Sequence, residues 1–267
     1  METFLAKQTA LVTGASSGIG ASCAIELARR GANVTVNYLH NRESTEKIVH
    51  ECLQFGVKAC AIQADVSDQA QVKRMFDETL DTFGRLDILV ANAGIQRDAN
   101  ILEMTLEDWQ KVIAVNLSSQ FLCAQRAAQI FVAQGVQNDI SLSAGKILHM
   151  SSVHDKIPWP GHCNYAASKG GIKMLMQTLA LELAPHKIRV NSLSPGAIKT
   201  RINKEVWSNP DAKEDLMEII PYQRLGQSVE VASVAAWLCS DYCDYVTGAT
   251  QYIDGGMTLY PSFSENG

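Results

Sequence analysis

Two residues four positions apart in a predicted helix, Tyr165 and Lys169, are of types suited to proton transfer. On a helix, residues at i and i+4 share a face and lie about one turn apart. A free tyrosine has a pKa of about 10 and is a poor base at neutral pH, but a nearby ammonium lowers that pKa by stabilising the phenolate. The spacing therefore predicts that Tyr165 is a general acid or base and that Lys169 tunes it.

A serine pair, Ser151-Ser152, follows the predicted strand Lys146–Met150, and Ser152 precedes Tyr165 by thirteen residues. The carboxyl ends of parallel strands open onto the crevice in which ligands bind. Ser152 is therefore expected to direct its hydroxyl toward that crevice and to polarise a substrate oxygen. Taken alone, a tyrosine and lysine at this spacing are usually surface residues, and Ser-Ser is usually a turn. Their combination with an upstream nucleotide-binding loop indicates an active site.

The stretch TGASSGIG, residues 13–20, joins the apolar run TALV to the helical stretch AIELARRG. A strand, a glycine-rich turn and a helix in this order bring backbone N–H groups and a helix N-terminus up to a pyrophosphate. A tight turn without a ligand is the alternative, but the position in the first βα unit of the chain favours a dinucleotide site. The residues predicted to bind the cofactor here are Gly14, Ser16, Ser17, Gly18, Ile19 and Gly20.

Asn37 occupies the position, about 20 residues further on, where an acid would bind the adenosine ribose 2′-OH and repel a 2′-phosphate. Arg42 follows and is placed to reach such a phosphate, although a solvated arginine at the start of a helix is an equal alternative. The missing acid favours NADP, or dual use of NADP and NAD. Both Asn37 and Arg42 are therefore candidate cofactor-binding residues.

Further candidate cofactor residues stand at the ends of later predicted strands. Asp65 and Val66 follow the third strand and are expected to meet the adenine. Asn92, Ala93 and Gly94 follow the fourth strand, where small side chains let the backbone approach the cofactor closely. The order of these groups along the chain, more than any one of them, indicates a cofactor site.

The elements that must position these residues alternate between apolar runs and segments of helical period. The predicted strands are residues 9–13, 33–37, 59–63, 86–91, 146–150, 189–193 and 250–253. Their near-continuous apolar character is typical of parallel strands that are covered on both faces. We therefore predict an α/β fold, a single-domain doubly wound (Rossmann) parallel sheet with helices on both faces, over residues 1–267. A polar loop at 134–145 and an irregular substrate loop near 196–224 interrupt the alternation.

Composition excludes several classes of function. A net charge of −5 gives no indication of nucleic acid or of an anionic membrane surface as a partner. No run approaches the roughly 18 apolar residues of a membrane span, and the first residues do not resemble a secretory signal. The seven cysteines are scattered and odd in number, which predicts reduced thiols and a cytoplasmic location. Cys239 and Cys243 lack an accompanying histidine cluster, so no metal site is predicted.

The ordered set TGASSGIG, Asn92-Ala93-Gly94, Asn116, Ser152, Tyr165-x-x-x-Lys169 and Pro195-Gly196 resembles the short-chain dehydrogenase/reductase family over nearly the whole chain. The resemblance implies that Tyr165 is the general acid/base, that Lys169 also binds the nicotinamide ribose, and that Ser152 positions the substrate. It implies that Asn116 supports a water-mediated proton relay. It also implies a homotetramer built partly on helices around 105–133 and 164–184. The further cofactor-binding residues that it implies are Tyr165, Lys169, Pro195, Gly196, Ile198 and Thr200.

The segment SSVHDKIPWP, residues 151–160, and the C-terminal segment 254–263 resemble the bacterial glucose 1-dehydrogenase branch of that family. In that branch a serine and a histidine, here Ser152 and His154, hold a polyhydroxylated ring. The predicted substrate-binding residues are Gln96, Ser152, His154 and Tyr165. Three residues depart from the branch: Gln96 replaces a carboxylate, Lys199 an asparagine and Leu39 an arginine. The expected substrate is a sugar, either glucose or a related aldose, oxidised at C1 to the lactone.

Two alternatives remain open at the level of sequence. One is an NADPH-dependent carbonyl reductase that acts on 3-oxoacyl thioesters or small ketones. The other is a regulator that binds the dinucleotide without catalysis. A sensor would be expected to lose the tyrosine or the lysine, whereas this chain has both.

Overall fold

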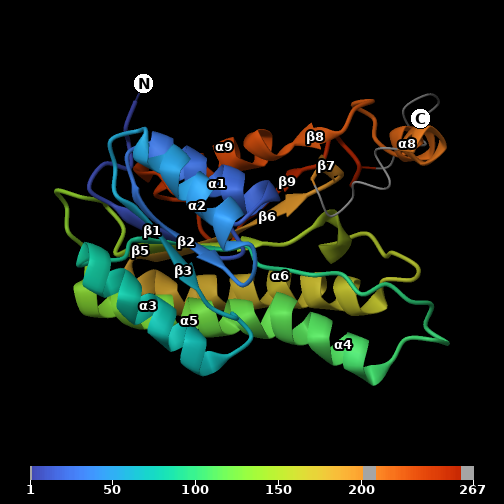
Figure 1. Ribbon diagram of the computed structural model, residues 1–267, viewed down its shortest axis with the longest axis horizontal. Coiled ribbons are helices and arrows are strands. Elements are labelled where there is room, and N and C mark those ends of the chain that lie inside the picture. The colour runs from blue at the N-terminus through green and yellow to red at the C-terminus, as the bar shows by residue number, and fades with distance from the viewer. Residues whose placement is uncertain (1, 201–208, 260–267) are drawn as a thin grey trace.

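The computed structural model describes residues 2–200 and 209–259 (Figure 1). Part of the predicted substrate loop, residues 201–208, lies outside the described residues. So does the end of the C-terminal segment, residues 260–263.

Seven strands form the central sheet in the order β3-β2-β1-β4-β5-β6-β9, and every neighbouring pair is parallel. The strands are β1 (Thr9–Val12), β2 (Asn33–Tyr38), β3 (Ala59–Gln63), β4 (Ile88–Ala91), β5 (Gly145–Met150), β6 (Ile188–Pro195) and β9 (Thr250–Ile253). The strand order reverses between β1 and β4, where the crevice for a ligand is expected. The predicted doubly wound parallel sheet is confirmed, with strand ends that differ from prediction by at most two residues.

Helices cover both faces of the sheet (Figure 1). On one face lie α1 (Gly18–Arg29), α2 (Arg42–Leu53) and α9 (Ser228–Leu238). On the other lie α3 (Gln69–Phe83), α4 (Leu106–Ile113), α5 (Ser119–Gln134) and α6 (Cys163–Leu183). Because both faces are covered, the strands carry unbroken apolar runs and not an alternation of apolar and polar residues.

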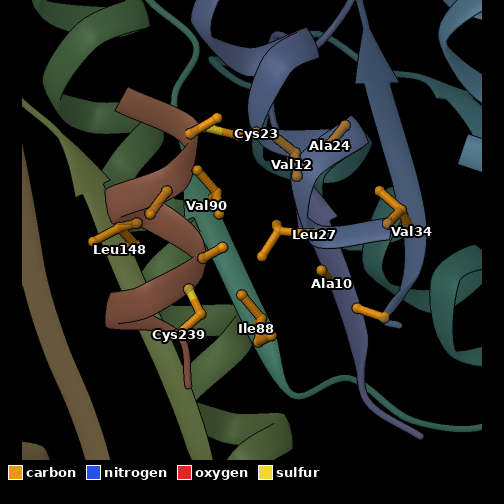
Figure 2. Close-up of a cluster of buried hydrophobic side chains, with 14 of the residues drawn as sticks. Ala10, Val12, Cys23, Ala24, Leu27, Val34, Ile88, Val90, Leu148 and Cys239 are labelled. Carbon is orange, nitrogen blue, oxygen red and sulfur yellow. The ribbon is translucent and has the colours of Figure 1, made fainter. Parts of the chain in front are cut away.

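Two clusters of buried side chains hold the three layers together. In the first, Leu27 of α1 and Cys239, the residue after α9, form one buried cluster with Ile88 and Val90 of β4 (Figure 2). In the second, Phe76 of α3 and Phe131 of α5 are fully buried against the opposite face of the sheet. Burial of each large apolar side chain contributes roughly 1.5–3 kcal/mol. These layers therefore provide a rigid base for the strand ends.

Two features of the fold differ from the sequence predictions. The segment 196–224 is not irregular throughout, because it contains β7 (Ile198–Lys199), paired with β8 (Gly226–Gln227), and α8 (Pro210–Glu218). Strands of two residues are too short to produce a periodic pattern. The predicted helix around 105–133 is interrupted by a five-residue π-helix, η1 (Ala114–Ser118). A single turn with i→i+5 hydrogen bonds leaves the apolar periodicity on either side nearly unchanged.

Among the described helices, none is both long and apolar enough to cross a membrane.

Candidate active site

The structure brings Ser152, Tyr165 and Lys169 together at the carboxyl end of β5. Ser152 is the second residue after this strand, and α6 places Tyr165 and Lys169 one turn apart beside it. The Lys169 Nζ lies 5.3 Å from the centroid of the Tyr165 ring and donates a hydrogen bond to the Met150 carbonyl at 2.9 Å. The Ser152 side chain forms a hydrogen bond with the Tyr165 phenol. This is the geometry that the sequence spacing predicts.

Burial has the largest effect on the pKa values of Tyr165 and Lys169. Burial raises the pKa of Tyr165, the hydrogen bond with Ser152 acts against this rise, and the charge of Asp98 adds to it. Burial also lowers the pKa of Lys169 to about 8, against an opposing effect of Asp155. The phenol therefore needs a positive charge beside it to ionise near neutral pH, and the Lys169 ammonium carries that charge only below about pH 8.

Asn116 is fully buried in the π-helix η1, and its side-chain amide joins two parts of the site. Its Oδ1 accepts a hydrogen bond from the Ile95 N–H at 2.8 Å, and its Nδ2 donates to the Ile95 carbonyl at 3.0 Å. The same Nδ2 donates to the Ser168 Oγ on α6 at 3.2 Å. The π-helix thus places Asn116 between the loop after β4 and the helix that carries Tyr165.

A stack of three aromatic rings stands beside Tyr165, and no sequence pattern predicts it. His154 stacks on Trp159 at 4.2 Å, and Trp159 stacks on His162 at 3.5 Å, between ring centroids. His154 and Trp159 each meet the Tyr165 ring edge-on at 6.2 Å. The His154 Nδ1 lies 3.0 Å from the Ile157 carbonyl, so its ring is fixed. Burial lowers the pKa of His154, which favours the neutral imidazole. His154 is therefore near the predicted acid/base.

The glycine-rich loop has the close backbone contacts that a dinucleotide site requires. A Cβ on Gly14 would lie 2.8 Å from the Ala93 Cα, and one on Gly20 would lie 2.7 Å from the Gly14 carbonyl oxygen. The Asn92 Nδ2 donates to the Thr13 carbonyl at 2.9 Å, which ties this loop to the end of β4. The next residue along the chain, Ala93, is the one that contacts Gly14.

The N-terminus of α1 remains free of side-chain capping. Ser17 is the N-cap residue, it makes no side-chain capping hydrogen bond, and no acidic residue lies in the first turn. Uncapped N–H groups at a helix N-terminus bind phosphate. Ser16, Gly18 and Ile19 around this turn are half-buried. The loop therefore fits the pyrophosphate of a nicotinamide dinucleotide.

Asn37 contributes to this loop in a way that the sequence did not predict. It is buried, its Oδ1 accepts a hydrogen bond from the Gly14 N–H at 3.1 Å, and its Nδ2 donates to the Ala64 carbonyl at 3.2 Å. The Asn37 side chain therefore holds the glycine-rich loop in place through a hydrogen bond to its backbone. Arg42, by contrast, is exposed at the start of α2, where its Nε lies 3.4 Å from the Glu46 carboxylate.

The remaining predicted cofactor residues lie at strand ends. Asp65 is half-buried and its Oδ1 accepts two hydrogen bonds from Ser67, whereas Val66 is buried in the second core cluster. Thr200 lies beside the glycine loop, because its Cγ2 is 3.7 Å from where a Cβ on Gly18 would be.

At the end of β6, Pro195 is buried and is followed by Gly196. A Cβ on Gly196 would lie 2.9 Å from the Asp254 Cα, which explains this glycine by close contact with the segment after β9. Ile198 is buried in β7. Gly94 lies beside Asn116, whose Oδ1 is 3.4 Å from where its Cβ would be.

Gln96 is a predicted substrate contact, and Cys239 and Cys243 are the pair of cysteines weighed above as metal ligands. Gln96 is half-buried and directly follows Ile95, the residue that Asn116 holds. Cys239 is buried in the first core cluster, and burial raises the pKa of its thiol to about 12. The Cys243 thiol donates to the Trp237 carbonyl at 3.0 Å. Within the described residues, no group of three or more His, Cys, Asp or Glu side chains is arranged to hold a metal ion.

Comparison with known proteins agrees with this geometry. A family model described as enoyl-(acyl carrier protein) reductase matches residues 14–258. The 3beta-hydroxysteroid dehydrogenase 1 of Eggerthella lenta is 43% identical over 256 residues, which cover 96% of this chain and 95% of that protein. The chain belongs to the short-chain dehydrogenase/reductase family. It is therefore an NAD(P)-dependent oxidoreductase that acts on a CH–OH or carbonyl group.

Relatives in this short-chain family carry different names. Glucose 1-dehydrogenase 2 of Bacillus subtilis is 41% identical over 259 residues, with 97% of both chains covered. Among solved structures, the gluconate 5-dehydrogenase of Burkholderia cenocepacia, in complex with NADP and tartrate, superposes with a TM-score of 0.88. It is 33% identical, and the match covers 97% of this chain and 98% of that one.

Proposed function

We propose that this short-chain dehydrogenase oxidises an aldose, such as glucose, at C1 to the lactone. The observation that carries the proposal is the turn after β5, where Ser152 and His154 present polar groups within reach of Tyr165. A ring with several hydroxyl groups needs several oriented hydrogen bonds, and a polar site rejects analogues that lack them. Gln96, which adds an uncharged donor and acceptor, is the further substrate contact that we propose. The relative named glucose 1-dehydrogenase 2 supports this substrate class.

In the proposed mechanism the Tyr165 phenolate removes the proton of the C1 hydroxyl. The Ser152 hydroxyl donates a hydrogen bond to the same substrate oxygen and holds it against Tyr165. The Lys169 ammonium stabilises the phenolate and would also hold the nicotinamide ribose. A nicotinamide dinucleotide held by the glycine-rich loop and Lys169 would supply the acceptor for the hydride that leaves C1. Asn116 supports a water-mediated relay that returns the proton of Tyr165 to solvent.

We further propose that NADP is preferred or that both cofactors are used. No acid stands at the end of β2 to repel a 2′-phosphate, since the strand ends in Asn37 and Tyr38 and is followed by Leu39. Arg42 begins α2 with an exposed guanidinium whose carboxylate partner, Glu46, is itself half-exposed. An exposed pair of this kind contributes little to stability, so Arg42 can exchange it for a phosphate at small cost. The gluconate 5-dehydrogenase structure with bound NADP supports this preference.

Replacement of Arg42 by alanine is expected to weaken NADP binding about tenfold and to leave NAD binding unchanged. A charge-assisted hydrogen bond to a phosphate is worth roughly 1.5 kcal/mol, which corresponds to about a tenfold change in Kd. Fluorescence titration of the protein with each cofactor measures both constants. Lys47→Ala is the matched control, because it breaks the exposed pair with Glu43 on the same helix. Equal losses for NADP and NAD would refute the assignment of Arg42 to the 2′-phosphate.

The substrate assignment is tested by a turnover screen of glucose, other aldoses, polyols, small ketones and a 3-oxoacyl thioester, each with both cofactors. We expect the highest kcat/KM for an aldose, because polyols and ketones lack the hydroxylated ring. Absence of aldose oxidation with either cofactor would overturn the sugar proposal and leave the oxidoreductase class intact.

A second candidate is NADPH-dependent reduction of a ketone or of a 3-oxoacyl thioester. The relatives named 3-oxoacyl-[acyl-carrier-protein] reductase, from Staphylococcus aureus and 40% identical, and 3beta-hydroxysteroid dehydrogenase 1 both favour it. The same screen distinguishes it, because reduction of the thioester or ketone would exceed aldose oxidation. A dinucleotide sensor without catalysis is disfavoured by the intact group of Ser152, Tyr165 and Lys169.

We also propose that the protein is a cytoplasmic homotetramer. Exposed apolar side chains on the two long helices, Phe121 on α5 and Met174 and Leu181 on α6, support contact with a second copy. The seven cysteines are all free, which supports a reducing compartment.

A further inference from the structure

A buried carboxylate, that of Asp155, lies behind the proposed acid/base. Asp155 ends the 3-10 turn η2 (Val153–Asp155) directly after Ser152, and its side chain is 0% exposed. Its Oδ2 accepts a hydrogen bond from the Ser194 Oγ of β6 at 2.5 Å, and its Oδ1 accepts one from the Tyr252 phenol of β9 at 2.7 Å. Two strands and the turn therefore fix the position of this negative charge.

Helix α6 presents three residues at successive turns toward this region. Tyr165, Lys169 and Lys173 stand at i, i+4 and i+8, so they share one face. The Lys173 Nζ lies 4.0 Å from the Asp155 Oδ1 and donates to the Tyr252 phenol at 3.1 Å. Because its side chain is 31% exposed, water and salt screen the charge of Lys173. It therefore offsets only part of the field of Asp155.

Lys169 is a buried ammonium that a nearby negative charge would stabilise. It is 3% exposed, and the hydrogen bond described for its ammonium goes to the neutral Met150 carbonyl. A buried ammonium is unfavourable unless an opposite charge lies near it. The neighbouring η1 carries no charged residue, and on α6 the flanking groups are the Tyr165 phenol and the Lys173 ammonium. Asp155 places a carboxylate beside this face of α6: it lies 4.0 Å from the ammonium of Lys173, one turn beyond Lys169, and its charge opposes the effect of burial on the pKa of Lys169.

We propose that Asp155 is a positioning residue of the reaction, which keeps Lys169 protonated and fixes the turn that presents Ser152. The second role rests on the carboxylate contacts, since the hydrogen bonds from Ser194 and Tyr252 hold the turn that carries Ser152 against β6 and β9. The proposal rests on the roles proposed above for Tyr165 and Lys169, but it does not depend on which substrate is oxidised. Asp155 acts through Lys169 and Ser152 and touches no reacting atom.

The negative charge of Asp155 affects the pKa of the Lys169 ammonium. A nearby negative charge raises the pKa of an ammonium, so it opposes the effect of burial on Lys169, whose pKa is lowered to about 8. Without the carboxylate, the Lys169 ammonium would lose its proton at a lower pH. The phenolate of Tyr165 would then lose its stabilising charge within the neutral range, and turnover would fall as the pH rises.

The test is the titration of Lys169 itself in the cofactor-free protein. The rate at which an amine reagent labels Lys169 is followed against pH by peptide mass spectrometry, in the native protein and in Asp155→Asn. We expect the midpoint to fall by about one pH unit in the variant, a tenfold weaker affinity for the proton. The alkaline limb of kcat/KM should move to lower pH by a similar amount. An unchanged midpoint for Lys169 would overturn the proposal.

Two further variants separate charge from structure. Lys173→Met breaks the contact with the same carboxylate but keeps its negative charge, so the Lys169 midpoint should not fall. A fall equal to that of Asp155→Asn would indicate a structural effect and would refute the proposal. If Asp155→Asn does not fold, the double variant Asp155→Asn/Lys173→Met avoids leaving the Lys173 ammonium without its carboxylate partner. The same downward shift is expected in it, and its absence would again overturn the proposal. The labelling measurement uses no substrate, so its failure is distinct from a failure of the proposed aldose oxidation.

Discussion

A Tyr165→Phe variant is expected to lose about 10²–10⁴-fold in kcat while it binds NADP and NAD as the native protein does. The hydroxyl is the only group removed, and the ring keeps its edge-on contacts with His154 and Trp159 at 6.2 Å. The Lys169 hydrogen bond to the Met150 carbonyl is independent of that hydroxyl. The loss should therefore appear in the chemical step and not in cofactor affinity.

Stopped-flow measurement of the first turnover, together with cofactor titration by fluorescence, checks this prediction. Tyr242→Phe is the matched control, because Tyr242 is 65% exposed and its phenol donates to Glu2, away from the site. It should keep native turnover. Substantial turnover by Tyr165→Phe with intact cofactor binding would mean that another group transfers the proton.

Gly20→Ala should weaken binding of both cofactors by about ten- to hundredfold. The added Cβ would lie 2.5 Å from the Asn92 Nδ2 and 2.7 Å from the Gly14 carbonyl oxygen. The Gly14 carbonyl belongs to the backbone, and the Asn92 amide is held by its hydrogen bond to Thr13. Neither group can move away from the added Cβ without opening the glycine-rich loop. Overpacking of this kind costs roughly 1–3 kcal/mol, and each 1.4 kcal/mol is a factor of ten in Kd.

Calorimetric titration with NADP and NAD measures this effect, and thermal unfolding shows whether the fold survives. Gly170→Ala on α6 is the control, since a Cβ there would meet nothing within 4 Å. Alanine also favours a helix by roughly 0.8–1 kcal/mol over glycine, so this control should not destabilise the protein. Native cofactor affinity in Gly20→Ala would refute the steric account of this loop.

The sequence alone predicts the sheet, the glycine loop and the grouping of Ser152, Tyr165 and Lys169, because each depends on local pattern. Parallel strands buried on both faces give unbroken apolar runs, and i, i+4 spacing fixes two side chains on one helix face. The order of motifs along the chain then orders the strand ends along one edge of the sheet. The role of Tyr165 stays a prediction until its variant is measured.

Contacts between segments far apart in the chain were decided only by the tertiary structure. Asn37 was expected at the ribose, but the packing of β2 against β3 buries it beneath Gly14. Nothing in the residues around Asp155 indicates that Ser194 and Tyr252, from two later strands, would surround its carboxylate. Local spacing thus placed Tyr165 and Lys169 on one helix face. The charge that acts on Lys169 depends on how deeply α6 is buried and on which strands meet beside it, and these are properties of the whole fold.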